Sequence, residues 1–246
     1  MEQCKKVTRK DFASMVLKFF GRGSGFSDNH NSAYFITEDN ELVIIDCSVL
    51  TFLKLEQLKL ESYRKIYVLI THTHGDHVGG LGLFVQYVYH MLRKHITIIA
   101  PSIEVGKDIE CLLKIEGVSK FWYQLIPSSE IKKKWFGNSI LTSHTPQLKG
   151  KCFGYKLFVN GTDVIYTGDT AILQPFVQYL TRNREFYVDI SIKKTEAHLN
   201  LERNLEQLIH FTQSLGVKIY LMHCDNVELA EKVVKDIPNI EVVSIE

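Results

Sequence analysis

Three histidines and an aspartate lie within six consecutive residues of this chain, in the segment His72-Thr73-His74-Gly75-Asp76-His77. The segment follows the apolar residues 66–70, whose length and β-branched and aromatic content are typical of a buried strand. The cluster therefore stands where a strand ends and a loop begins. Because side chains alternate along a strand, His72 and His74 are expected to point to one side. The turn through Gly75 then brings Asp76 and His77 in from another direction.

Imidazole and carboxylate are ligands that zinc and its first-row relatives accept without thiolate. Two converging groups separated by a glycine indicate two metal ions rather than one. The alternative is a run of solvated histidines. A lone His-x-His pair would be weak support for a metal site, whereas the complete His-x-His-x-Asp-His pattern is specific. We therefore expect a centre for two divalent metal ions per chain, with Zn²⁺ favoured and Mn²⁺ as the alternative.

The composition describes an ordinary globular chain of 246 residues, 45% hydrophobic and 23% charged, with a net charge of +1. Near-neutrality argues against a broad surface for long nucleic acid, though not against binding of one short substrate phosphate. No apolar run reaches membrane-spanning length, and the N-terminus lacks the apolar region of a signal peptide. The five cysteines show no Cys-x-x-Cys spacing. We expect a cytoplasmic protein with reduced thiols and no membrane partner.

The order of expected elements is hairpin-rich β structure followed by helix–strand alternation, once in each half of the chain. We expect strands over residues 15–20, 32–37, 41–47, 66–70, 95–100, 139–143, 154–159, 164–166, 186–192, 217–222 and 240–245, and helices over 52–65, 81–93, 104–115, 172–180, 201–215 and 227–236. Two sheets packed face to face with helices outside fit this order. One domain over residues 1–246 is the economical interpretation.

A dinuclear site needs more than four ligands, so later strand ends must supply the others. His144, Asp169 and His223 each follow directly after an expected strand. The carboxylate of Asp169 can bridge two cations, because each of its oxygens can bind one. Taken singly, each residue has a structural alternative, as a capping aspartate or a partly buried histidine. Their shared position at strand ends favours the role of metal ligands.

These motifs together resemble the metallo-β-lactamase fold superfamily, over nearly the full length of the chain from the first strand to His223. The resemblance implies an α/β fold, a four-layer αββα sandwich that holds two metal ions between the edges of its sheets. It assigns His72, His74 and His144 to the first metal, Asp76, His77 and His223 to the second, and Asp169 to the bridge between them.

Two segments are similar to the phosphodiesterase branch of this superfamily, which includes tRNA 3′-processing endonucleases. They are Phe153-Gly154-Tyr155 and Thr195-Glu196-Ala197-His198-Leu199-Asn200, and the opening residues 19–25 and 29–32 resemble that branch as well. In this branch a histidine at the position of His198 donates a proton to the leaving group. The resemblance therefore implies His198 as a catalytic residue, together with the ligand Asp76. A surface histidine at the start of a helix is the alternative for His198.

The spacing of His144 and Asp169 argues against tRNA processing. Those endonucleases usually insert a long tRNA-gripping arm between these ligands, whereas only 25 residues separate them here. A nearly neutral chain without this arm has little positive charge with which to bind a large polyanion such as tRNA. Compact members of the branch include anti-Pycsar enzymes, which cleave cyclic mononucleotides in phage immune evasion, and this chain is most similar to them. We expect a phosphodiesterase for small nucleotides, acting in the host cytoplasm if phage-encoded.

Three other functions remain as alternatives: a tRNA 3′-processing endonuclease, a lactone or thioester hydrolase of the same fold, and a binding protein without activity. Compact members commonly pair, so we expect a homodimer, in which the helix over residues 81–92 is either an interface or a core element. Phe153 and Tyr155 either stack on a base or pack in the core. His30 is an ordinary loop residue or approaches the substrate. Cys224 is left out of the ligand set because adjacent strand residues point oppositely.

Overall fold

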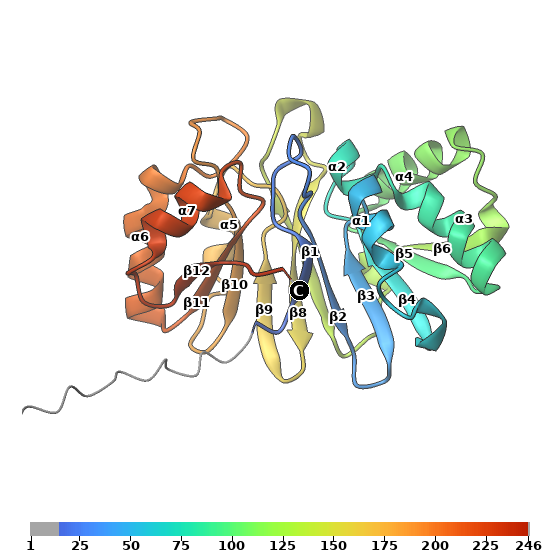
Figure 1. Ribbon diagram of the computed structural model, residues 1–246, viewed down its shortest axis with the longest axis horizontal. Coiled ribbons are helices and arrows are strands. Elements are labelled where there is room, and N and C mark those ends of the chain that lie inside the picture. The colour runs from blue at the N-terminus through green and yellow to red at the C-terminus, as the bar shows by residue number, and fades with distance from the viewer. Residues whose placement is uncertain (1–14, 246) are drawn as a thin grey trace, which may run out of the picture.

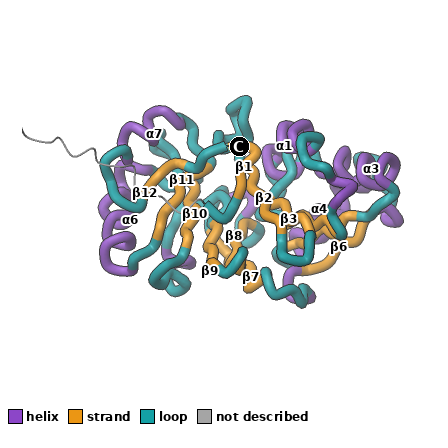
Figure 2. Tube along the Cα trace, turned by 60° about the horizontal axis from the view of Figure 1, so that its bottom comes forward, coloured by secondary structure: helices purple, strands orange, loops and turns teal. Residues whose placement is uncertain are grey.

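The computed structural model describes residues 15–245, which form two six-stranded sheets packed face to face between two layers of helices (Figure 1). Figure 2 shows the helices on the two outer sides and the strands between them. The first sheet consists of β1 (Lys18–Gly21), β2 (Ser32–Ile36), β3 (Glu41–Ile45), β4 (Lys65–Leu69), β5 (Ile96–Ala100) and β6 (Tyr123–Pro127), in that order. The second has the order β12 (Ile240–Val242), β11 (Lys218–Met222), β10 (Glu185–Asp189), β9 (Thr162–Tyr166), β8 (Cys152–Val159), β7 (Phe136–Thr142). The predicted αββα sandwich is confirmed.

The helices divide between the two outer layers. Those of the first half are α1 (Val49–Leu55), α2 (Gly75–Val78), α3 (Leu81–Leu92) and α4 (Ile103–Ile115), and those of the second are α5 (Gln174–Val177), α6 (Leu201–Leu215) and α7 (Val227–Val234). Short 3₁₀ turns form at η1 (Leu60–Ser62), η2 (Lys120–Trp122), η3 (Ser128–Glu130) and η4 (Pro146–Leu148). In the part of the chain that the structure describes, no helix has the length and apolar character needed to cross a bilayer.

Both sheets bury apolar side chains on both faces, which is why the fold has four layers. Phe35 and Tyr155 belong to the core between the sheets. Phe84 of α3 packs in the core outside the first sheet, and Leu208 of α6 packs in the core outside the second. Burial of apolar area on this scale is the main favourable contribution to folding. A sheet covered on both faces reads as nearly continuous apolar sequence.

The strand directions bring the loops that carry the predicted ligands to one edge. Strands β3 to β6 are parallel to one another, as are β9 to β12. Strand β7 runs in the same direction as β9, since each is antiparallel to β8. The carboxyl ends of β4, β7, β9, β10 and β11 therefore meet at one edge of the sandwich, where α2 lies (Figure 1).

Several local predictions are confirmed by the structure. Asn160 and Gly161 have φ angles of 48° and 81°, as the two-residue turn between β8 and β9 requires. Gly216, at φ 63°, ends α6 in the left-handed conformation. Helix α3 ends one residue before the predicted position. The cysteines at 47, 111, 152 and 224 are free thiols, while Cys4 lies outside the described residues.

Other boundaries were predicted wrongly. The helix expected over 52–65 begins at Val49, where the Ser48 hydroxyl accepts a hydrogen bond from the amide of Thr51, and it ends at Leu55. The apolar residues that follow pack on the core from a turn, so their helical spacing misled the prediction. The helix expected over 172–180 is only α5. Strand β6 was missed because it lies at a sheet edge and no residue in it is fully buried.

Candidate metal centre

The structure brings all seven predicted ligands together at the edge where these strands end. They come from four segments far apart in the sequence: the residues after β4, after β7, after β9 and after β11. Most of them are buried, with exposed fractions of 0% for His72, 1% for His77, 3% for Asp169 and 3% for His223. So many ionisable groups rarely share a buried space unless they pair with one another or bind an ion.

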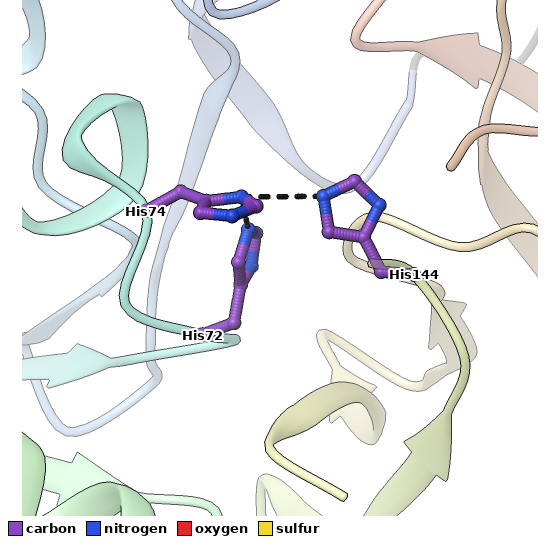
Figure 3. Close-up of side chains that lie close together, drawn as sticks. All are labelled: His72, His74 and His144. Carbon is purple, nitrogen blue, oxygen red and sulfur yellow. Dashed lines mark hydrogen bonds between the residues drawn. The ribbon is translucent and has the colours of Figure 1, made fainter. Parts of the chain in front are cut away.

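The first group consists of His72, His74 and His144, whose rings face one another from opposite sheets (Figure 3). His74 Nδ1 lies 3.0 Å from His72 Nε2 and 3.2 Å from His144 Nε2. His144 Nδ1 donates a hydrogen bond of 2.7 Å to the carbonyl of Ala197, so in the neutral ring Nε2 carries the lone pair. Burial lowers the pKa of all three imidazoles, which favours the neutral form that binds metal.

The second group consists of Asp76, His77 and His223, with Asp169 between the two groups. Asp76 Oδ2 lies 3.2 Å from His77 Nε2 and 3.3 Å from His223 Nε2. Asp169 Oδ2 lies 3.3 Å from His77 Nε2 and 3.4 Å from His223 Nε2. The same oxygen is 3.6 Å from His144 Nε2 in the first group. A carboxylate in this position faces both sets of nitrogens, as a bridging ligand must.

The atoms at the centre fit divalent cations. His77 Nε2 and Asp169 Oδ1 are buried and make no hydrogen bond. Leaving such atoms without a partner costs free energy that an ion would recover. Burial lowers the pKa of His223, but the carboxylates of Asp169 and Asp189 more than offset this and raise it to about 10. The second group therefore favours positive charge, and the nitrogen and carboxylate donors of the centre suit zinc or manganese.

Asp46 supports the second group and was missed by the sequence analysis. It is fully buried after β3, in a left-handed conformation at φ 62°. Its Oδ2 accepts a hydrogen bond of 2.8 Å from His77 Nδ1, and its Oδ1 accepts one of 2.8 Å from the amide of Thr71. This contact turns His77 Nε2 toward the centre, as carboxylate partners of ligating histidines do. The available signal was an acidic residue closing an apolar strand.

His198 lies beside the two groups, close to His144 and Asp169. Its Nδ1 donates a hydrogen bond of 2.8 Å to Oδ2 of Asp189, a fully buried residue at the end of β10. Its ring stacks on His223, with ring centroids 5.0 Å apart. Burial lowers the pKa of His198, but Asp189 outweighs this effect and the net pKa is raised. Asp189 was also missed, because it lies inside the strand predicted over residues 186–192, whereas in the structure it is the last residue of β10.

The loop over residues 22–31 packs directly on the second group. A Cβ atom at Gly25 would lie 2.6 Å from Asp76 Oδ2, so any other residue there would require the side chain of Asp76 to shift. His30 in the same loop is close enough for the charges of Asp76, His77 and His223 to influence its pKa, which burial lowers overall. Phe26, next to Gly25, is fully exposed. Gly25 belongs to the opening residues 19–25, but its contact with Asp76 was not predicted from the sequence, and Phe26 was not singled out.

The remaining candidates lie in the protein core or form other contacts. Phe153 and Tyr155 are buried at 8% and 0% exposure, so they pack in the core and offer no surface to a base. Cys224 is buried in the core outside the second sheet, which agrees with leaving it out. His90 of α3, a histidine outside the predicted ligand set, forms a ring contact with Trp122.

The two-sheet sandwich and the position of this cluster define a protein of the metallo-β-lactamase fold. A solved structure with this fold, the protein YhfI from Bacillus subtilis, matches with a TM-score of 0.73 at 16% identity, covering 93% of this chain and 95% of that one. The family described as "Anti-Pycsar protein Apyc1" matches residues 15–240. The chain belongs to this anti-Pycsar family.

Individual relatives in this family come from bacteria and from phages. The anti-Pycsar protein Apyc1 of Saccharibacillus brassicae is 27% identical over 229 residues, covering 87% of this chain and 92% of the relative. That of Bacillus phage 010DV004 is 27% identical over 243 residues, covering 87% and 91%. These comparisons, together with the His/Asp cluster, support an enzyme of the metal-dependent hydrolase class.

Proposed function

We propose that the protein is a metal-dependent phosphodiesterase that hydrolyses small nucleotides, with cyclic mononucleotides as its substrates. The observation that carries this proposal is His198, an imidazole of raised pKa held by Asp189 beside the ligand groups. A departing ribose oxygen is a poor leaving group and needs a proton, which a positioned imidazolium can give near neutral pH. Membership of the anti-Pycsar family supports the same substrate class.

The proposed roles divide between the ligands and the proton donor. The ligands of the two cations, Zn²⁺ or alternatively Mn²⁺, are His72, His74 and His144, then Asp76, His77 and His223, with Asp169 shared. When bound, the cations would activate a water and balance the charge of the phosphoryl oxygens. Because Asp189 engages Nδ1 of His198, the proton for the leaving oxygen comes from Nε2. Asp189 also stabilises the imidazolium before transfer.

We propose that the nucleobase of the substrate stacks on the side chain of Phe26. Its side chain is fully exposed at the rim of the centre, one residue after the glycine that packs on Asp76. The loop is held by a hydrogen bond of 2.7 Å from the amide of Gly23 to the carbonyl of Asn29. Stacking on an exposed aromatic ring tolerates any base.

We further propose a cytoplasmic homodimer, paired through α1 and α3. Leu83, Tyr87 and Met91 recur every four residues along α3, and Leu83 and Met91 are 48% and 69% exposed. Tyr87 contacts Phe52 of α1, and Leu53 beside it is 61% exposed. A second copy would cover this apolar face. Sedimentation showing a monomer at micromolar concentration would reject the dimer.

The phosphodiesterase proposal is tested by incubating purified protein, loaded with zinc or with manganese, with cyclic mononucleotides and cyclic dinucleotides. Chromatography should detect the linear mononucleotide as the product. A precursor tRNA and a lactone serve as the substrates of the two rival enzymes. Hydrolysis of either of these, without hydrolysis of any cyclic nucleotide, would overturn the proposal.

A further inference from the structure

Asp225 lies two residues after the predicted ligand His223 and holds the start of the loop that carries His198. We infer that Asp225 is a positioning residue for the proton donor, acting through the loop over residues 191–199. This inference rests on the proposed function, because it assigns Asp225 a part in proton transfer by His198.

The carboxylate of Asp225 binds three consecutive residues at the start of the loop. Its Oδ1 accepts a hydrogen bond of 2.7 Å from the amide of Ile192. Its Oδ2 accepts one of 3.1 Å from the amide of Lys193 and one of 3.0 Å from the hydroxyl of Ser191. Hydrogen bonds to an ionised acceptor are stronger than neutral ones. Both carboxylate oxygens are thus engaged in fixing this segment.

The far end of the loop returns to the same point. The amide of Ser191 donates a 2.7 Å hydrogen bond to the carbonyl of Leu199, and the amide of Leu201 donates one of 2.9 Å to the carbonyl of Ser191. His198 lies on this returning limb, directly before Leu199. Ser191 therefore fixes the limb of the loop that carries His198. In this way it sets the position of the His198 imidazole relative to Asp189, to which that imidazole is hydrogen-bonded.

The segment that contains Asp225 is itself fixed to the metal centre. His223 is a predicted ligand, and the amide of Cys224 donates a 2.8 Å hydrogen bond to the carbonyl of Arg22. The amide of Ser24 donates one of 3.1 Å to the carbonyl of Cys224. Residues 223–225 therefore connect a ligand, the loop beside Asp76 and the loop of His198. These connections matter because a misplacement of a catalytic group by about 1 Å can lower the rate roughly 10²-fold.

The test compares Asp225→Asn with wild type on two substrates. One is a cyclic mononucleotide, and the other is a nucleoside p-nitrophenyl phosphodiester, whose leaving group needs no proton. In the variant one acceptor oxygen becomes an amide that faces N–H donors, so the loop loses part of its anchor. We expect kcat on the cyclic nucleotide to fall roughly 10- to 100-fold with little change in KM, because only the placement of the proton donor is disturbed. The loss on the nitrophenyl ester should be several-fold smaller, with metal content unchanged.

Asp236→Asn is the matched control, since Asp236 is exposed on the surface after α7 and carries the same charge. It should leave both rates unchanged. A double-variant cycle sharpens the test: if Asp225 acts through His198, Asp225→Asn should cost nothing further in a His198→Ala background. Equal losses on both substrates, loss of metal, or full activity of Asp225→Asn would overturn the inference alone. If His198→Ala itself spares the cyclic nucleotide, the proton-donor role fails, and the inference fails with it.

Discussion

The substitution His198→Ala separates proton donation from metal binding. Its imidazole bonds to Asp189 through Nδ1, and Asp189 Oδ2 keeps a hydrogen bond of 2.9 Å from the amide of Thr170 after the ring is removed. The buried carboxylate therefore retains a donor, so the fold and both metals should persist. A positioned general acid is worth roughly 10²- to 10⁴-fold in rate. The side chain of His198 is 21% exposed, so water can partly replace it. We therefore expect a loss in the lower half of that range, about 2.7 to 4 kcal/mol.

The assay measures kcat for a cyclic mononucleotide and for a p-nitrophenyl diester, together with metal content. The loss should be large on the first substrate and small on the second, because nitrophenolate departs without a proton. His210→Ala, at an exposed histidine on α6, is the control and should behave as wild type. If His198→Ala loses metal, His198 is a ligand and the assignment of His223 is in doubt. Full activity on the cyclic nucleotide would refute the proton-donor argument.

Three further predictions concern the metals and the substrate. Asp169→Ala should weaken binding of both ions, because Asp169 Oδ2 faces both groups, whereas His223→Ala should chiefly weaken binding of the second ion. Metal analysis at saturating metal measures both effects, and a single ion per wild-type chain would contradict the bridging role of Asp169. Gly25→Ala should displace Asp76 and lower the occupancy of the second metal. The control Gly106→Ala, whose Cβ would meet only Ala100 at 3.4 Å, should leave both metals in place. Equal metal occupancy in the two variants would disprove the close approach of Gly25 to Asp76. Phe26→Ala should raise KM for a nucleotide roughly 5- to 150-fold with kcat unchanged, from stacking of about 1–3 kcal/mol, and Phe26→Trp should preserve KM. An unchanged KM in Phe26→Ala would refute stacking.

The cluster of histidines and aspartates was predictable because its signal is local. His72 to His77 are neighbours in sequence at the end of an apolar strand, and His144, Asp169 and His223 repeat that position after later strands. The carboxyl ends of parallel strands lie at a common edge, so residues that directly follow such strands are expected to meet there, and all seven do. The same locality explains why α6 was predicted with its final residue and Gly216 stop, since both depend on adjacent residues.

The residues around the ligands were decided only by tertiary structure. Asp46 and Asp225 carry no motif and contact distant parts of the chain, His77 and residues 191–193. Asp189 also carries no motif and contacts His198 across the loop that follows β10. An acidic residue that closes an apolar strand is only a weak signal, because the sequence does not show whether its side chain is solvated or is a buried anchor. That distinction depends on which strands lie side by side.

Burial likewise cannot be read from residue type alone. Phe153 and Phe26 are both phenylalanines in segments close to the site, yet the first is buried and the second fully exposed. Strand β6 also depends on tertiary structure, because it lies at the end of its sheet and pairs there with β5. The sequence by itself determined where strands end in the histidines and aspartates predicted as metal ligands, because those patterns span a few residues. Tertiary structure decided which carboxylates orient them and which rings face solvent, because both depend on how the strands and loops pack together.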